Sequence, residues 1–374
     1  MIIQREKEVL STYFPTSFDN DDTLIQSERR FFKNSENGVL LAKDDSALSL
    51  DKIIKQSDDM DSRWRNYFVD NSQGTKFTVT NDCKIAFKDS YGTSYSLDMT
   101  EHAFAQLCQK LGVPTTYIRK CFDEGKDTLA VQNLKAWIEG NNGGFMFRTT
   151  DNVARAVVSD SYVPFDNYKI LRTLKHTMDI KRFVPTQVYL SQDKLHIRFV
   201  DFTPLPVNDG TGKPLYAGFI LSSSNVGTRS MKLNFFIFRP VCTNGLTLTR
   251  LGGTLFSLPH ATRKEQQSKM EVFAEAFKGI DALCETSVNL IKTTSKKNLT
   301  KDEMAYLVQK ARGDLKISQK NTDILSNVIA TKYDQTQWGF INGLTEFAQN
   351  FDNLDTRIDI ENWAGNYFAR AKVA

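Results

Sequence analysis

Long apolar runs and the spacings of common metal sites are both absent from this sequence. No stretch approaches the ~18 consecutive apolar residues that a membrane-spanning helix needs. The N-terminus carries charges at positions 5–8, where a secretory signal would have an apolar segment. The four histidines show neither H-x-x-x-H nor H-E-x-x-H spacing: His102, His176, His196 and His260. We therefore expect a cytoplasmic protein without a membrane partner and without a bound metal.

Cysteine is scarce and scattered along the chain. The five cysteines form no C-x-x-C pair: Cys83, Cys108, Cys121, Cys242 and Cys284. An odd count in a chain that opens without a signal peptide argues for reduced thiols. We expect these residues to act as small buried hydrophobic side chains.

Nucleotide-binding and acyl-transfer motifs are missing as well. Residues 210–214, GTGKP, differ from a phosphate loop because Val207 stands where the first Gly is required and Pro214 replaces the Ser or Thr that would hold Mg²⁺. No G-x-S-x-G motif supplies a nucleophile. We predict no enzymatic activity and no cofactor. An active site built from carboxylates far apart in the sequence, such as that of a nuclease, stays an open alternative.

Charge is distributed unevenly over the 374 residues, whose net charge is +4. Residues 151–270 hold 16 basic and 8 acidic side chains, a net charge of +8. Residues 1–70 have a net charge of −4 (10 basic, 14 acidic), residues 71–150 of +1 (9 and 8) and residues 271–374 of −1 (13 and 14). A concentrated basic segment is typical of proteins that bind polyanions. The alternative is that basic and acidic segments neutralise each other in the folded protein.

Hydrophobic periodicity and composition predict four regions. Residues 1–70 form a polar, acidic N-terminal arm, and residues 71–150 a small mixed α/β unit. Residues 151–263 form a basic, β-rich core, and residues 264–374 a helical C-terminal region. The expected fold class is α+β, with a central, mostly antiparallel sheet and flanking helices.

Individual elements are predicted within these regions. KFTVT and KIAFK alternate as strands, and Thr100 is expected to cap a helix that ends at Gly112. NVARAVVSD, a hairpin of TQVYL and KLHIRFVD, LYAGFIL and MKLNFFIFRPV supply the strands of the central sheet. Residues 204–214 are expected to form a mobile surface finger, and residues 241–245 a tight turn in which Asn244-Gly245 supplies a positive φ.

An apolar seam begins the helical region, with spacings of 3, 4, 3, 4 and 7 and Ser287 at the skipped position. Its members are Met270, Phe273, Phe277, Ile280, Cys284 and Ile291. Such a seam forms either a coiled coil, which would make a homo-oligomer, or a helix face packed on the sheet. Three heptads are short for a free coiled coil, which favours packing. Thr300 and Glu303 predict a capping box for the next helix, and a further helix contains Trp338.

Basic and amide side chains interrupt the predicted strands of the core. Polar residues 222–229 are expected to form a loop, and Arg239 stands beside aromatic rings in an otherwise apolar strand. An Arg alternating with rings is typical of a single-strand platform, where charge follows the backbone and rings stack on bases. The alternative is that the phenylalanines are core and that Arg239 pairs with a buried carboxylate. The candidate nucleic-acid-binding residues are Arg155, Arg198, Asn225, Arg229, Lys232, Arg239 and Asn244.

Four segments, in order, resemble one known family. They are Arg155–Tyr162 with Phe165-Asp166-Asn167, Ser224–Gly227, Phe238–Gly245 and Trp338–Glu346. The resemblance covers about residues 75–350 and is to the phage/plasmid-like proteins, domain-of-unknown-function family 932. It implies an origin on a mobile element and a place in the bacterial host cytoplasm, and it supplies no reaction. The family loop often has an acidic residue where this chain has Val226, which argues against a metal role there.

The leading functional hypothesis is nucleic-acid binding. The favoured ligand is single-stranded DNA, bound during recombination or replication of a phage or plasmid. The predicted sheet with its flanking helix is similar in architecture alone to single-strand annealing recombinases of the Red-beta and Erf-like class. Those proteins are oligomeric, metal-free and ATP-independent. The alternative function is interaction with host or phage proteins, such as countering a host defence system, without nucleic-acid binding.

Overall fold

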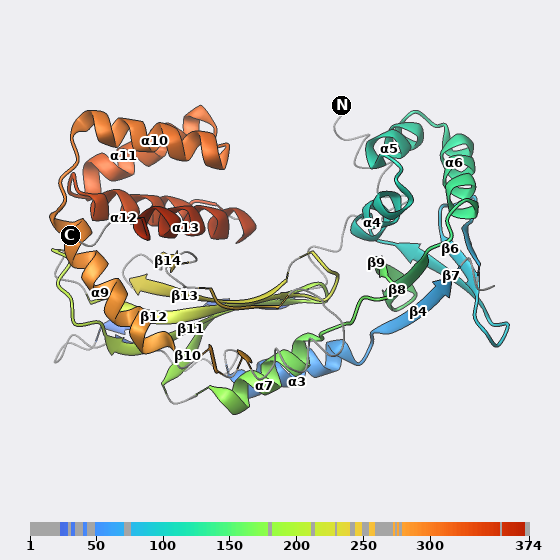
Figure 1. Ribbon diagram of the computed structural model, residues 1–374, viewed down its shortest axis with the longest axis horizontal. Coiled ribbons are helices and arrows are strands. Elements are labelled where there is room, and N and C mark those ends of the chain that lie inside the picture. Colours follow the sequence, from blue (N-terminus) through green and yellow to red (C-terminus); the bar gives the residue numbers. More distant parts are fainter. Residues whose placement is uncertain are drawn as a thin grey trace.

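The computed structural model describes most of the chain from residue 49 onward, and the backbone of three short strands before it. For residues 238–239, 244–248, 254–256, 258 and 354–355 it describes the backbone alone. The described residues are 23–28, 31–33, 40–42, 49–70, 76–178, 182–210, 214–228, 230–239, 244–248, 254–258, 272–273, 275–276, 279–351 and 354–370. Two sheets, each with its own helices, follow one another along the long axis of the molecule (Figure 1).

The larger sheet has seven strands, and every pairing in it is antiparallel. The order is β1-β10-β11-β12-β13-β14, with β15 also paired to β13. β10 and β11 form the predicted hairpin, with Tyr189 opposite His196. The strands are β1 (Thr23–Glu28), β10 (Phe183–Ser191), β11 (Lys194–Pro204), β12 (Tyr216–Ser224), β13 (Met231–Arg239), β14 (Asn244–Leu248) and β15 (Thr254–Leu258).

The smaller sheet has the order β4-β8-β9-β7-β6-β5, and only its β7–β9 pairing is parallel among the described strands. A separate two-stranded sheet joins β2 (Phe31–Lys33) to β3 (Leu40–Ala42). The strands of the smaller sheet are β4 (Arg65–Asp70), β5 (Phe77–Val79), β6 (Ile85–Lys88), β7 (Ser94–Met99), β8 (Gly144–Thr150) and β9 (Val153–Ser159). The strand predicted from NVARAVVSD therefore belongs to this sheet, and the expected boundary at residue 150 falls inside it.

Three helices cover the smaller sheet: α4 (Glu101–Leu111), α5 (Thr115–Asp123) and α6 (Asp127–Glu139). The local signals for α4 are confirmed. The Thr100 side chain accepts a hydrogen bond from the Ala103 N–H at 3.1 Å, and Gly112 ends the helix in the left-handed conformation, with φ +71°. A residue with a Cβ is strained there, which explains why the helix stops at a glycine.

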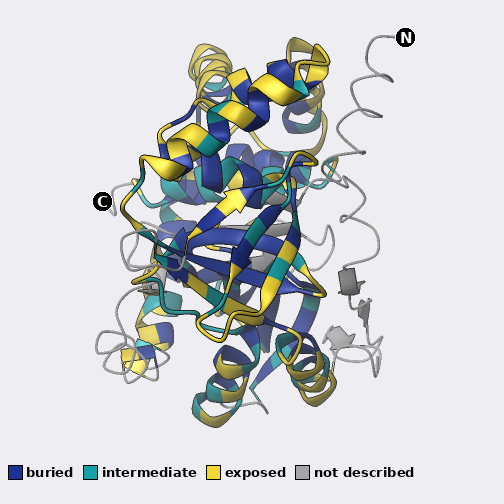
Figure 2. Cartoon of the chain, turned by 90° about the vertical axis from the view of Figure 1, so that its right-hand side faces the viewer, coloured by how far each residue is buried: buried dark blue, intermediate teal, exposed yellow. Residues whose placement is uncertain are grey.

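Helices enclose the larger sheet from both sides (Figure 1). On one face, α3 (Leu50–Asp61) and α7 (Asn167–Thr177) pack against each other and against strand residues such as Phe199 and Phe219. On the other, α13 (Leu354–Phe368) and α12 (Gln337–Ala348) contact β14. The remaining helices are α9 (Ile280–Lys296), α10 (Lys301–Leu315) and α11 (Gln319–Lys332). In Figure 2 the strands are mostly buried and the helices expose their outer faces.

The aromatic residues of the sheet belong to the core. Phe235 and Phe236 point to opposite faces, and both side chains are fully buried. Phe199 and Phe219 stack with ring centroids 4.7 Å apart inside the sheet–helix interface. The core interpretation of these rings is confirmed, and neither described face of the sheet offers them to a base.

The apolar seam of the helical region also packs inward. Phe273, Ile280 and Ile291 are buried in the same core cluster as the larger sheet, and Ser287 is fully buried beside them. Met270 and Phe277 lie outside the described residues. Packing onto the sheet is confirmed for the described members. Thr300 and Glu303 form the predicted capping box at the start of α10.

Two local predictions are wrong. In the described part of the predicted finger, residues 204–210, Leu205 and Asp209 are buried and the Asp209 carboxylate accepts a hydrogen bond from Trp338 Nε1 at 2.9 Å, so this part is not a free finger. Asn244 pairs with Arg239 in the β13–β14 ladder, so the Asn-Gly pair opens a strand and does not form the turn. Both errors have one cause. Turn-forming residues predict a loop from local sequence, whereas here Asp209 is bonded to Trp338 and Asn244 is paired with Arg239.

The cysteines behave as predicted where they are described. Cys83, Cys108 and Cys121 are buried free thiols, and Cys284 is partly buried. Burial raises the pKa of Cys83 to about 12 and the pKa of Cys108 and of Cys284 to about 11. Cys242 lies outside the described residues. No helix in the described part of the chain has the length and apolar character needed to cross a membrane.

Candidate functional site

The seven predicted binding residues do not form one surface. Arg155, Arg198 and Asn225 are buried, whereas Lys232 is exposed on β13. Arg229 lies outside the described residues. Arg239 and Asn244 are described by their backbone alone, in the paired strands β13 and β14. The prediction that Arg155, Arg198 and Asn225 are available to a ligand is therefore wrong, because their side chains are buried.

Arg198 is a structural residue that ties α13 to the sheet. Its Nη2 donates to Glu361 Oε2 at 2.6 Å, and its guanidinium lies 5.8 Å from the centroid of the Phe236 ring. Burial raises the pKa of Glu361, while the charge of Arg198 acts in the opposite direction. A buried pair of this kind is costly to break because one charge is left without its partner. Arg198 therefore holds the C-terminal helix in place.

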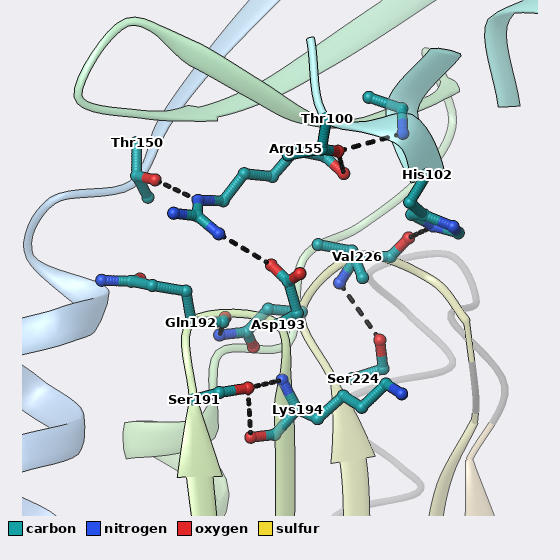
Figure 3. A network of polar contacts seen from close by, with 12 residues as sticks. Thr100, His102, Thr150, Arg155, Ser191, Gln192, Asp193, Lys194, Ser224 and Val226 are labelled. Carbon is teal, nitrogen blue, oxygen red and sulfur yellow. Dashed lines mark hydrogen bonds and ion pairs between the residues drawn. The ribbon is translucent and has the colours of Figure 1, made fainter. Parts of the chain in front are cut away.

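Arg155 connects the smaller sheet to the β10–β11 turn of the larger one (Figure 3), and Asn225 joins that turn to the β12–β13 turn. Arg155 Nε donates to Thr150 Oγ1, and Arg155 Nη1 lies 3.5 Å from Asp193 Oδ1 in the β10–β11 turn. The backbone N–H of Asn225 donates to the Asp193 carbonyl at 2.9 Å. The Asn225 side chain donates to the Gln192 carbonyl at 3.1 Å. These contacts fix the two hairpin turns against β9.

A partly buried acidic residue, which the sequence did not single out, lies on the other side of Asn225. Asp61, at the end of α3, accepts hydrogen bonds from the Tyr168 N–H at 2.7 Å and from Asn225 Nδ2 at 3.3 Å. Desolvation raises the pKa of Asp61 from 3.8 to about 7, with a further rise from Asp166 and opposing effects from the two donors and Arg148. In the sequence Asp61 ends the acidic segment Asp-Asp-Met-Asp at residues 58–61, and such a segment is usually exposed to solvent.

Arg148 completes this junction from β8. The side chain is fully buried, and its Nη2 donates to Asp166 Oδ1 at 2.9 Å. The guanidinium lies 4.7 Å from the centroid of the Trp64 ring and 5.9 Å from that of Tyr162. Cation–π contacts and one ion pair thus keep a charge in the interior. The junction of Asp61, Arg148 and Asp166 joins the two sheets.

A pocket of about 580 Å³ opens beside the junction, between α4, β9 and the β12–β13 turn. The Val226 carbonyl in this turn accepts a hydrogen bond from Gln106 Nε2 at 3.0 Å and lies 3.2 Å from His102 Nε2. Gly227 follows with φ +76°, a conformation that only glycine adopts readily. The lining residues are Gln106, Gln109, Lys110, Val157, Val158, Ser159, Tyr162, Gly227, Thr228 and Ser230.

The pocket presents amide, hydroxyl and ammonium groups. Among the described lining residues, only Lys110 carries a formal charge. Partial burial lowers the pKa of Lys110, and the nearby charge of Asp160 acts in the opposite direction. Such donors are the groups that contact phosphate oxygens. Gln106 and Lys110 stand four residues apart on α4, a spacing that could have marked them in the sequence.

Acidic residues, histidines and cysteines do not gather at this pocket. Among the described residues, no group of three such side chains is placed to hold a metal ion. The Val226 carbonyl oxygen accepts a hydrogen bond from Gln106, and the Val226 side chain packs with Trp64 and Tyr162. The arrangement is therefore suited to binding an anion through hydrogen-bond donors.

Comparison with known proteins identifies a family. The profile described as "Domain of unknown function (DUF932)" matches residues 154–371, more than half of the 374-residue chain. No curated protein matches the chain, and no solved structure does. The match spans β9 and Gly227, which line the pocket, and extends through α12 at the far end of the larger sheet. The chain belongs to the domain-of-unknown-function family DUF932.

Proposed function

We propose that this protein binds nucleic acid, above all single-stranded DNA, through the pocket beside α4 and the adjoining β12–β13 connection. The observation that carries the proposal is the chemistry of the pocket. Lys110, two glutamines and several hydroxyl groups line it, and no carboxylate is among its described lining residues. The β12–β13 connection belongs to the segment 151–270, whose net charge is +8.

The proposed mode of binding is positioning of the phosphate backbone. Amide, hydroxyl and ammonium groups contact phosphates without reading sequence. Stacking of bases on the sheet is not part of the proposal, because Phe235 and Phe236 are fully buried. We place this activity in recombination or replication of a phage or plasmid, without a cofactor, in line with the family resemblance.

The test is fluorescence anisotropy of a labelled single strand over a series of salt concentrations. For a single strand, the slope of log affinity against log salt is about −0.7 for each neutralised phosphate. Lys110→Glu combined with Lys232→Glu should weaken binding for all sequences and reduce the magnitude of the slope by about 1.4. Both lysines are exposed, so the fold should be preserved.

Lys310→Glu combined with Lys320→Glu is the matched control, since it makes the same change in charge. These exposed residues lie on α10 and α11, at the other end of the molecule from α4 (Figure 1). The control should bind DNA almost as the unaltered chain does. Equal weakening by both pairs would mean that net charge alone matters and would contradict the proposed site.

A second candidate function, protein–protein interaction, is supported by a different surface. Trp137 on α6 is 53% exposed and lies at a hollow of about 440 Å³ that Leu111 and Ala136 also line. Exposed aromatic residues are enriched where proteins bind one another. Absence of DNA binding at ~50 mM salt, which favours the electrostatic contribution, would favour this second function. A Trp137→Ala variant would then be tested for loss of partner binding.

A further inference from the structure

A second pocket, of about 360 Å³, is lined by residues from the ends of α9, α11 and α12. These helices lie at the left in Figure 1, at the other end of the larger sheet from α4. It forms where the α9–α10 connection meets the α11–α12 connection. An isolated bridge joins Asn298 to Thr336, and the Gln337 N–H donates to the Lys297 carbonyl at 3.0 Å. The lining residues are Asn208, Asp209, Gly210, Lys292, Ser295, Lys296, Lys332, Tyr333, Asp334, Thr336, Trp338, Gly339 and Asn342.

Two ammonium groups at this pocket are available to a ligand. Lys292 and Lys296 lie one turn apart on α9, are exposed, and form no ion pair with any described residue. Lys332, at the end of α11, is paired with Glu346. Because the two lysines of α9 come from one rigid helix, their spacing is set before any ligand arrives.

The start of α12 adds to the positive potential and presents a buried amide. Thr336 caps this 12-residue helix, and its first turn lines the pocket, so the positive end of the helix dipole lies there. Asn342, one turn further on, is only 7% exposed and lines the pocket. A side-chain amide at this place can both donate to and accept from a polar ligand.

Two carboxylates shape the rest of the pocket. Asp209 accepts the hydrogen bond from Trp338 Nε1, which closes the floor of the pocket. Asp334 is exposed at its edge, where a carboxylate can accept hydrogen bonds from hydroxyl groups. Gly339 allows this tight geometry, since a Cβ at that position would overlap the backbone oxygen of Asp334.

We infer that this second pocket binds a small phosphate ester that carries hydroxyl groups, of the size of a sugar phosphate or a nucleoside monophosphate. Lys292 and Lys296 bind the phosphate through their ammonium groups, and the positive end of the α12 dipole adds to the attraction. The Asn342 amide and the Asp334 carboxylate bind hydroxyl or ring polar groups. The volume admits one such molecule, and the pocket is separate from the proposed DNA-binding site.

The test is isothermal titration calorimetry on the full chain with ribose 5-phosphate, adenosine monophosphate, inorganic phosphate, ribose and adenosine. At least one phosphate ester should bind more tightly than about 1 mM, and the unphosphorylated compounds should not bind. Lys292→Gln combined with Lys296→Gln should lower the affinity at least about tenfold, since two charge-assisted contacts are lost. Lys301→Gln combined with Lys310→Gln, on the exposed face of α10, is the control and should bind as the unaltered chain does.

Three results would overturn the inference. They are an absence of binding by both esters, unchanged affinity in the α9 variant, and inorganic phosphate binding as tightly as either ester. Displacement of the bound ester by a single-stranded oligonucleotide would equally assign the phosphate to nucleic acid and refute a small-molecule ligand. The α9 variant should keep its DNA affinity, so failure here and failure of the proposed DNA binding are distinguishable.

Discussion

Replacing Asp61 by Asn should remove a pH-dependent loss of stability from this protein. In the folded chain, burial raises the pKa of Asp61 from 3.8 to about 7. The folded state therefore keeps a proton that the unfolded state releases between these pH values. Stability is highest below pH 3.8 as far as this group is concerned, and it falls as the pH rises towards 7. Above pH 7 the loss from Asp61 is complete and constant.

The size of the effect follows from the two pKa values. At ~1.4 kcal/mol per pH unit, the difference between 3.8 and about 7 corresponds to an upper value of about 4 kcal/mol. Roughly 2 to 3 kcal/mol of this falls between pH 5 and pH 7. An asparagine has the same shape, and its Oδ1 can still accept the hydrogen bond from the Tyr168 N–H. The variant should thus lose the pH dependence and keep the Tyr168 contact, while the hydrogen bond from Asn225 Nδ2 is lost at every pH because an NH₂ group replaces its acceptor.

Urea unfolding at pH 5, 6, 7 and 8 measures this directly. The control is Asp59→Asn, the same exchange at an exposed position on the same helix. The unaltered chain and the control should lose stability from pH 5 to pH 7, and Asp61→Asn should lose less by roughly 2 to 3 kcal/mol. Burial also raises the pKa of Glu361, which contributes in the same direction in all three chains and cancels in the comparison. Parallel curves for all three would refute the argument, because Asp61 would then be ionised already at pH 5.

Other predictions test the buried pair and the core. Arg198→Ala should lower the free energy of unfolding by about 3–5 kcal/mol, since Glu361 would be left buried without its partner, and denaturant unfolding measures this. Arg198→Met combined with Glu361→Leu should recover most of that loss, and a double variant as unstable as the single one would contradict the assignment. Phe273→Asp should abolish the cooperative unfolding transition in circular dichroism, because it places a charge at a fully buried position.

Local signals in the sequence predicted the elements well, because each depends on near neighbours. The cap at Thr100 needs only an N–H three residues away, and the capping box of Thr300 and Glu303 is equally local. The hairpin of β10 and β11 follows from alternation and a short turn. It was harder to predict to which sheet each strand belongs. The strand β9 was expected in the central sheet, but it pairs with β8 and belongs to the smaller sheet.

The candidate site shows where local reasoning ends. Alternation places an Arg in a strand, but it does not say what covers that face of the sheet. Arg198 meets Glu361, which is 163 residues further along the chain, and such a partner leaves no periodic signal near either residue. Gln106 and Lys110 lie on a helix of the smaller unit, and only the approach of the β12–β13 turn makes them part of a pocket.

The amino-acid sequence by itself determined the fold class, most helices and strands, the uneven charge and the family. These depend on local propensity, periodicity and composition, which any stretch of chain carries within itself. Only the tertiary structure decided that Arg155, Arg198 and Asn225 are interior contacts and that the ionisable Asp61 is partly buried at the junction of two sheets. The physical reason is that burial and pairing are properties of surfaces brought together from distant segments, and desolvation acts on a side chain only after those surfaces meet.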